Sequence, residues 1–394
     1  MGFFSGAKTL GILGGGQLGK MLLSVTRQWD ISTKVLDPSA ESPGRLACNE
    51  FVQGDLMDYD TVVAFGDQLD VLTIEIENVN TAALETLEKR GVAVYPQAKV
   101  LKIIQNKCLQ KVFYKEQNIP TAPFENFADT TALKDAVGRA QISFPFVWKS
   151  AAMGYDGYGV KVVRSNQDLE SLSEGPCMAE EMVPIKKELG VIVCRRPQGE
   201  IAIYPLVEME FHPEANQVEY VISPARVSKK ISEQATAIAK KVSQAYQHVG
   251  LLAVELFLTQ TGELLVNEVA PRPHNSGHYS IEAAYTSQFE QHIRALLDLP
   301  LGKTQNKAAA VMVNLVGKEG FSGPVHYNNM DQILGIEGVN PHWVYSKGRL
   351  QLMGQIIMVI GRCSACTISH HSSITHAIIF LNLHLRQCAV KLRN

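Results

Sequence analysis

The sequence has few of the features that mark secreted, membrane-spanning or nucleic-acid-binding chains. Its 7 cysteines, spread over 394 residues without paired spacing, do not make a disulfide framework, so we expect a reducing cytoplasm. No apolar run reaches the ~18 to 20 residues that cross a bilayer, and the N-terminus lacks the regions of a signal peptide. A formal net charge of −2 argues against nucleic acid as a partner. Hydrophobic residues at 46% and charged residues at 19% predict a globular chain with a sizeable core.

Acidic residues are missing from one end of the chain. The segment 355–394 contains no Asp or Glu, whereas 3 of the 7 cysteines and 4 of the 11 histidines lie beyond residue 360. A zinc site is one interpretation, but the usual loop between ligand pairs is absent, so an unrelated or diverged tail is favoured. The residues concerned are Cys363, Cys366, His370, His371 and His376.

Apolar patterns divide the chain into an α/β part and an α+β part. In the first hundred residues short apolar strands alternate with helical patterns, which predicts right-handed crossovers and an open parallel sheet. The strands are expected at 9–13, 33–36, 71–76 and 92–95, and the helices at 18–29 and 81–90. A periodic segment at 101–117 predicts one helix, and further on we expect a helix at 232–248 and strands at 252–258, 264–269 and 308–316. The predicted domains are 1–105, 106–300 and 301–394.

A glycine-rich loop joins the first expected strand to the first expected helix. Gly14 to Gly19 have the pattern G-x-G-x-x-G, and Asp37 ends the next strand. Glycines let the backbone approach a phosphate, and a helix N-terminus supplies N–H donors and a partial positive charge. Taken alone the pattern suggests NAD, and a tight turn without a ligand is the plainer alternative. We favour a loop for a phosphorylated small molecule.

The middle of the chain carries residues suited to a nucleotide. Lys149 ends an apolar strand and precedes a glycine hairpin at 154–159 that can fold over a triphosphate, although no Walker A spacing is present. The apolar segment 177–183 ends in acids, with Glu188 beyond it. Such a segment can offer backbone groups to adenine and a carboxylate to ribose, but taken by itself it is better explained as an ordinary edge strand with a solvated acidic end.

Two glutamates interrupt apolar strands farther on. A turn at Thr261-Gly262 would bring Glu255 and Glu268 side by side on one face of a hairpin. Buried like charges repel unless a cation lies between them, and with Asn267 they suit Mg²⁺ bound to nucleotide phosphates. The alternative is a pair of exposed strand glutamates, which their apolar neighbours disfavour.

Three motifs together identify a family resemblance. They are ILGGGQLGKM at 12–21, GYDGYG at 154–159 and NEVAPRPHNSGHY at 267–279. With them the chain, from about Lys8 to Gly354, resembles the ATP-grasp ligases and, among these, the branch that carboxylates 5-aminoimidazole ribonucleotide. The resemblance implies an ATP-grasp fold with an N-terminal parallel α/β domain and a small C-terminal domain. It also implies that ATP phosphorylates bicarbonate, and that the amine of the ribonucleotide captures the carboxyl group of the resulting carboxyphosphate.

The resemblance implies roles for residues of this sequence, with ATP and Mg²⁺ as cofactors and a homodimer as the assembly. ATP would be bound by Lys107, Lys149, Gly154, Tyr155, Gly157, Tyr158, Gly159, Glu180, Glu181, Met182, Val183, Glu188, His212, Asn267 and Glu268. Mg²⁺ would be bound by Glu255 and Glu268, and the ribonucleotide by Gly16, Gln17, Leu18, Glu75 and Arg349. The implied catalytic residues are Asp156, as the base for the amine, and Arg272, His274, Asn275 and Lys347.

Three other functions stay open. Another ATP-grasp carboxylate ligase would share Lys149, Glu255 and Glu268, but we expect it to lack the APRPHNSGH run. A nicotinamide dehydrogenase would rest on the glycine loop and Asp37, with no site for hydride transfer farther along the chain. An inactive nucleotide-binding variant is suggested by the tail, because Gln355 stands where the family has histidine after Met-Gly, and the resemblance ends after Gly361.

Overall fold

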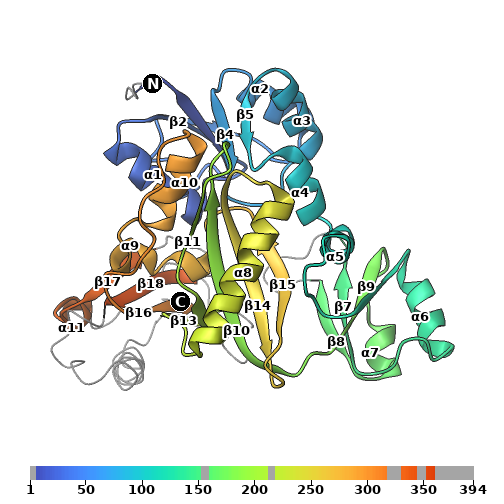
Figure 1. Ribbon diagram of the computed structural model, residues 1–394. Coiled ribbons are helices and arrows are strands. Elements are labelled where there is room, and N and C mark those ends of the chain that lie inside the picture. Colours follow the sequence, from blue (N-terminus) through green and yellow to red (C-terminus); the bar gives the residue numbers. More distant parts are fainter. Residues whose placement is uncertain (1–5, 152–158, 212–217, 317–329, 344–351, 360–394) are drawn as a thin grey trace, which may run out of the picture.

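The N-terminal part of the protein is a parallel α/β sheet. The structure is a computed structural model that describes residues 6–151, 159–211, 218–316, 330–343 and 352–359 (Figure 1). The first sheet has the order β3-β2-β1-β4-β5, with all pairs parallel. Its strands are β1 (Thr9–Leu13), β2 (Ser32–Asp37), β3 (Glu50–Gln53), β4 (Val71–Ile74) and β5 (Ala93–Tyr95), and its helices are α1 (Gln17–Gln28), α2 (Tyr59–Gly66) and α3 (Thr81–Lys89). Every residue of β4 is buried, as expected of a strand covered on both faces, and the predicted α/β fold is confirmed.

The expected single helix at 101–117 is two helices. They are α4 (Ala98–Ile104) and α5 (Lys107–Glu116). The Asn106 side chain accepts a hydrogen bond from the Leu109 N–H at 3.0 Å and so begins α5 as an N-cap. The Gln105 side chain donates to the carbonyls of Glu77 and Val79 in the N-terminal part. The apolar period of the sequence runs through both helices without interruption. The break between them depends on the distant carbonyls that Gln105 binds, so the period alone does not predict it.

A small antiparallel sheet follows. Its order is β6-β9-β7-β8, and at one side of the molecule it faces the larger sheet (Figure 1). The elements are β6 (Phe124–Phe127), α6 (Thr130–Gly138), β7 (Phe146–Ser150), β8 (Val160–Val163), α7 (Asn166–Glu170) and β9 (Cys177–Glu181). Phe146, Trp148 and Ala179 turn one face of this sheet into a core with Leu133 of α6. Lys149, the residue directly after Trp148, therefore lies on the other face.

The large sheet has nine strands and crosses the expected boundary at residue 300. The order is β15-β14-β10-β12-β13-β16-β18-β17, with β11 paired to β10. The strands are β10 (Ile185–Arg195), β11 (Ile201–Ile203), β12 (Val207–Phe211), β13 (Val218–Ser223), β14 (Gly250–Thr259), β15 (Leu264–Ala270), β16 (Ala310–Val316), β17 (Val339–Trp343) and β18 (Leu352–Val359). Helix α8 (Lys229–Tyr246) covers one face (Figure 1), and its Ala235, Ala239 and Val242 pack on apolar strand residues. The three domain boundaries stay predictions.

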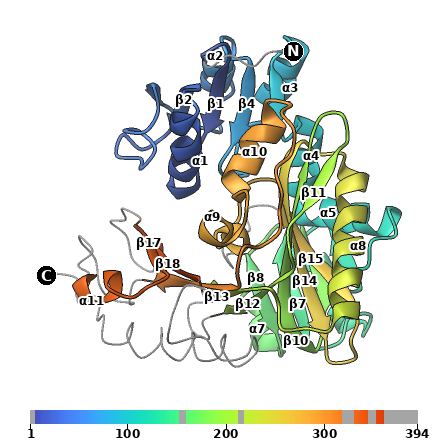
Figure 2. The same cartoon turned by 60° about the vertical axis from the view of Figure 1, so that its left-hand side comes forward.

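Helix α10 joins the N-terminal sheet to the rest of the molecule. The remaining elements are η1 (Asn275–Gly277), α9 (Ser280–Ala283), α10 (Gln288–Leu296) and α11 (Met330–Leu334). Phe289 and Ile293 of α10 share one core with Leu22 and Leu23 of α1, and the two helices lie together in Figure 2.

Among the described residues, none of the helices combines the length and apolar character that crossing a bilayer requires.

Candidate active site

A β-bulge gathers the acidic residues of the site. The β14–β15 register shifts between Val254 and Leu256, so that two residues of β15, Asn267 and Glu268, stand opposite Glu255. In a regular strand two successive side chains would point to opposite faces. A bulge re-aims one of them, and here Asn267 Nδ2 lies 3.4 Å from Glu255 Oε2.

Two lysines meet this group from other elements. Lys107, the first residue of α5, places Nζ 2.6 Å from Glu268 Oε2. Lys149 of β7 places Nζ 3.2 Å from Asn267 Oδ1. Despite the cost of burial, the Lys107 ammonium holds the pKa of Glu268 well below its usual range. The two sheets thus enclose a set of cations and carboxylates that come from distant parts of the chain.

Glu180 of β9 binds two lysines. Its carboxylate lies 2.9 Å from Lys149 Nζ and 2.5 Å from Lys111 Nζ, and the Lys111 and Glu180 side chains are each 3% exposed. Burial lowers the pKa of Lys111 to about 8 in spite of this pairing. Lys111 was not among the predicted site residues, although its position four residues after Lys107 places it on the same face of a helix and was a usable signal.

The expected adenine segment has an uneven exposure. Glu181 and Met182 are exposed and Val183 is half-buried, whereas the Glu180 carboxylate is turned toward the lysines. Gly159, the described end of the glycine hairpin, accepts a hydrogen bond from Ser150 N–H through its carbonyl at 2.8 Å.

Several expected residues lie outside the described ranges: Gly154, Tyr155, Asp156, Gly157, Tyr158, His212, Lys347 and Arg349, together with the five Cys and His of the tail.

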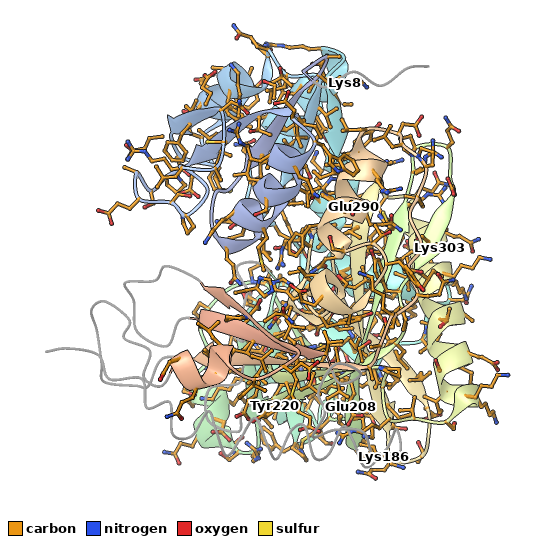
Figure 3. All side chains as sticks on the ribbon, turned by 90° about the vertical axis from the view of Figure 1, so that its left-hand side faces the viewer. Lys8, Lys186, Glu208, Tyr220, Glu290 and Lys303 are labelled. Carbon is orange, nitrogen blue, oxygen red and sulfur yellow. The ribbon has the colours of Figure 1, made fainter. Side chains whose placement is uncertain are left out.

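Glu188 adjoins a cavity and carries a raised pKa. Burial, with Glu255 and Glu268 nearby, raises the pKa of Glu188 to about 7. The cavity is about 350 Å³ in volume and is lined by Lys186, Lys187, Glu188, Glu208, Phe211 and Arg226, among others. Figure 3 shows Glu208 and Lys186 at the end of the large sheet far from Lys8. The charges of Glu255 and Glu268 therefore disfavour an ionised Glu188, and among the described residues no three acidic, histidine or cysteine side chains are grouped so that they could hold a metal ion.

The glycine loop is closed by carboxylates of its own domain. Asp37 Oδ2 accepts from the Gly15 N–H at 2.7 Å, so Asp37 holds the loop in place. Glu75 accepts from the Gly19 N–H at the start of α1, and a Cβ added to Gly16 would overlap its Oε1. Burial raises the pKa of Glu75 to about 7. The Gln17 and Leu18 side chains are half-buried in the first turn of this helix.

The NEVAPRPHNSGHY run lies at the seam between the N-terminal part and the large sheet. Arg272 Nε is 2.9 Å from Glu77 Oε2, a pairing across 195 positions that the sequence did not predict. His274 Nε2 is 3.3 Å from Glu255 Oε1. Asn275 Oδ1 accepts from Gln355 Nε2 at 2.9 Å, so the residue that replaces the family's histidine contacts an expected catalytic residue.

Buried titratable groups predict how stability depends on pH. Burial lowers the pKa of His248, His278 and His292 to about 3, so their contribution is lost as the pH falls from about 6.5 toward 3. Glu75 and Glu188, raised to about 7, act in the opposite sense, because the folded state keeps their protons as the pH rises above 4.5. Between pH 4.5 and 6.5 the unfolded state therefore binds about one proton more than the folded state does.

We therefore expect the free energy of unfolding to fall by up to about 1.4 kcal/mol per pH unit on acidification from 6.5 to 4.5. Below pH 4.5 the fall should steepen, because Glu180 and Glu268, whose pKa values are lowered, then take up protons on unfolding. Urea unfolding at half-unit pH steps measures both slopes. If the free energy of unfolding instead increases on acidification from pH 6.5 to 4.5, the three histidines are not neutral in the folded protein.

An N-terminal parallel sheet followed by two facing antiparallel sheets, with lysines and carboxylates between them, defines an ATP-grasp protein. Family models agree: residues 7–105 match the ribonucleotide synthetase preATP-grasp domain and residues 112–289 match the ATP-grasp domain. The N5-carboxyaminoimidazole ribonucleotide synthase of Bacillus subtilis strain 168 is 40% identical over 315 residues, which cover 79% of this chain and 81% of that protein. The chain belongs to the N5-carboxyaminoimidazole ribonucleotide synthase family, as the resemblance predicted.

Two further relatives define the extent of the match. The chain is 38% identical to the phosphoribosylaminoimidazole carboxylase of Vigna aconitifolia over 87% of its own length, but it spans only 62% of that longer protein. The crystal structure of the Aspergillus clavatus N5-carboxyaminoimidazole synthase, in complex with ADP and 5-aminoimidazole ribonucleotide, superposes with a TM-score of 0.84 at 30% identity. That match covers 97% of this chain and 100% of the other.

Proposed function

We propose that this protein catalyses the ATP-dependent carboxylation of 5-aminoimidazole ribonucleotide by bicarbonate. The products are N5-carboxyaminoimidazole ribonucleotide, ADP and phosphate. The proposal rests on family membership and on the site, and it includes the homodimer and the residue roles that the sequence predicts.

A single observation carries the proposal: the residues suited to ATP are continuous with those suited to an acyl phosphate. His274 is 3.3 Å from Glu255, inside the group that includes Lys107 and Lys149. Two residues earlier, Arg272 reaches Glu77, which lies two positions after the Glu75 that accepts a hydrogen bond from Gly19 of the glycine loop. These contacts place the residues proposed for ATP next to those proposed for the acyl phosphate.

ATP and Mg²⁺ would occupy the space between the two sheets. Lys107 and Lys149 would neutralise phosphate oxygens, and Glu188 with the cavity beside it would take the ribose. Glu255 and Glu268 would hold Mg²⁺ through their carboxylate oxygens, the ligands that this hard cation prefers. When bound, Mg²⁺ supplies charge neutralisation for phosphoryl transfer.

Bicarbonate and the amine would react beside Arg272, His274 and Asn275. A bicarbonate oxygen attacks the γ-phosphorus and ADP leaves, giving carboxyphosphate. The amine nitrogen then attacks the carboxyl carbon, phosphate leaves, and a base accepts the amine proton. Arg272 would balance the negative charge of the acyl phosphate, and Asp156 is proposed as the base.

The ribonucleotide would contact the glycine loop through its uncharged part. Gly16, Gln17 and Leu18 begin α1, but the Glu75 carboxylate already accepts a hydrogen bond from that helix N-terminus. A phosphate would be repelled by Glu75 in its ionised form, whereas a ribose hydroxyl can donate to it. We therefore assign the phosphate to Lys347 and Arg349.

The test is ADP release in the presence of Mg²⁺, bicarbonate and ATP, with and without 5-aminoimidazole ribonucleotide. We expect release that depends on the ribonucleotide and incorporation of ¹⁴C from bicarbonate into an acid-labile product. Release that is independent of the ribonucleotide, or that is stimulated only by another amine or carboxylate, would rule out the proposed acceptor. Absence of turnover with retained ATP binding would identify an inactive variant.

A further inference from the structure

The buried amide of Gln288 binds the backbone of His274. Gln288 is the first residue of α10 and is 0% exposed. Its Oε1 accepts from the His274 N–H at 3.0 Å, and its Nε2 donates to the His274 carbonyl at 2.8 Å. One side chain therefore satisfies both backbone groups of one residue, much as a neighbouring β-strand would.

This arrangement requires His274 to be extended. Its φ of −133° and ψ of 152° turn its N–H and carbonyl toward the same side, where the Gln288 amide lies. Gln288 Nε2 also lies 2.8 Å from His278 Nδ1, which is itself 2.8 Å from the His274 carbonyl oxygen. A Cβ on Gly277 would overlap Gln288 Oε1, so the glycine of the APRPHNSGH run makes room for the pair of Gln288–His274 hydrogen bonds, which we call the clamp.

The direction of the His274 imidazole follows from its fixed backbone. Its Nδ1 is 2.9 Å from Ser276 Oγ, and its Nε2 is 3.3 Å from Glu255 Oε1. Rotation of the His274 peptide would swing the imidazole away from Glu255, since the Cα–Cβ bond turns with the backbone. An error of about 1 Å in such a group costs on the order of 100-fold in rate.

We propose that Gln288 is a positioning residue that holds His274 in place for the reaction. The inference deepens the proposed function and rests on it for its catalytic part. Gln288 acts through His274 and not on a substrate, because its side-chain oxygen and nitrogen are engaged with His274 and His278 in the part of the chain that the structure describes.

The same helix offers a matched control. Gln291, also 0% exposed, accepts from the Gly302 N–H at 2.7 Å and donates to the Gly302 carbonyl at 2.9 Å. It therefore makes the same kind of clamp on a residue that has no role in the site. Gln288→Met and Gln291→Met each remove two side-chain hydrogen bonds to the backbone of one residue, so both should lower the unfolding midpoint.

We expect Gln288→Met to lower kcat on the order of 10- to 100-fold while the KM for ATP changes less than about twofold. Gln291→Met should keep kcat within about twofold of the unmodified protein. Equal losses of kcat in the two variants, or no loss in Gln288→Met, would overturn the proposal. If Gln288→Met does not fold, Gln288→Glu takes its place, because a protonated carboxyl can accept and donate as the amide does.

In Gln288→Glu the clamp should fail as the introduced carboxyl ionises. Its kcat relative to the unmodified protein should therefore decrease as pH rises from 6 to 9, while the ratio for Gln291→Glu stays constant. The titratable and charged side chains around this position are His274 and His278, with Glu255 beyond His274 and with Arg272 and His342 near His278. A ratio that does not change with pH would contradict the positioning role.

An NMR readout separates this inference from the proposed function. With ¹³C-labelled histidine, the ring resonance of His274, assigned by its loss in His274→Asn, should move in Gln288→Met and stay in Gln291→Met. An unmoved resonance would overturn the clamp whatever the protein catalyses. A moved resonance in a protein without ribonucleotide-dependent ADP release would support the clamp and refute the proposed reaction.

Discussion

Replacement of Glu268 by glutamine is expected to lower kcat for ADP release on the order of 100- to 1,000-fold. Glutamine keeps the size of the side chain but removes the charge that pairs with Lys107 at 2.6 Å. It also leaves Glu255 as the principal charged ligand proposed for Mg²⁺, so the Mg²⁺ concentration that gives half-maximal activity should rise. Steady-state assays across a Mg²⁺ titration measure both effects.

Glu263→Gln is the matched control, because Glu263 is an exposed carboxylate on the same β14–β15 hairpin. It should leave both kcat and the Mg²⁺ requirement unchanged. A Glu268→Gln variant with an ordinary Mg²⁺ requirement would exclude Glu268 from the cation site. Thermal unfolding of both variants checks that the loss of activity does not come from unfolding.

Replacement of Glu180 by glutamine should destabilise the fold by about 3–5 kcal/mol. The change leaves Lys111 and Lys149, which are 3% and 8% exposed, without the carboxylate that both of them bind. Two desolvated ammonium groups then face each other, and the protein must either deprotonate one of them or admit water. Urea unfolding at pH 7 measures the loss.

Two variants test whether the effect comes from the buried charges. Lys111→Met should cost less than Glu180→Gln, because it removes a desolvated cation and leaves the Lys149–Glu180 pair intact. Glu181→Gln, at the next and exposed position of β9, should be neutral within about 0.5 kcal/mol. Similar losses for Glu180→Gln and Glu181→Gln would show that Glu180 does not serve as the counter-ion.

The N-terminal sheet illustrates what local pattern can predict. Strands expected at 9–13 and 33–36 correspond to β1 and β2, and the helix expected at 81–90 corresponds to α3. Apolar alternation and turn residues act within a few positions of one another, so these elements are visible in the sequence. The order of the nine-stranded sheet was not visible, because β16 and β18 join β13 through pairings with residues far away in the chain.

The candidate site shows the same division. Residue types alone suggested Lys149, Glu255 and Glu268, since lysines and carboxylates interrupting apolar strands are costly to bury without a purpose. The bulge that places both Asn267 and Glu268 opposite Glu255 could not be predicted, because it depends on how two strands pair. Glu77 was missed for a related reason, since its only signal is its contact with Arg272.

By itself the sequence determined the class of fold, the family and the chemistry of the cleft, because glycines, lysines and carboxylates keep their meaning in short motifs. Only the tertiary structure decided which groups are partners. It assigned Glu75 to the helix N-terminus where a phosphate was expected, and Glu180 to two lysines. It also joined Gln288 to His274. Such pairings follow from packing, which brings together side chains from separate elements and which no local pattern records.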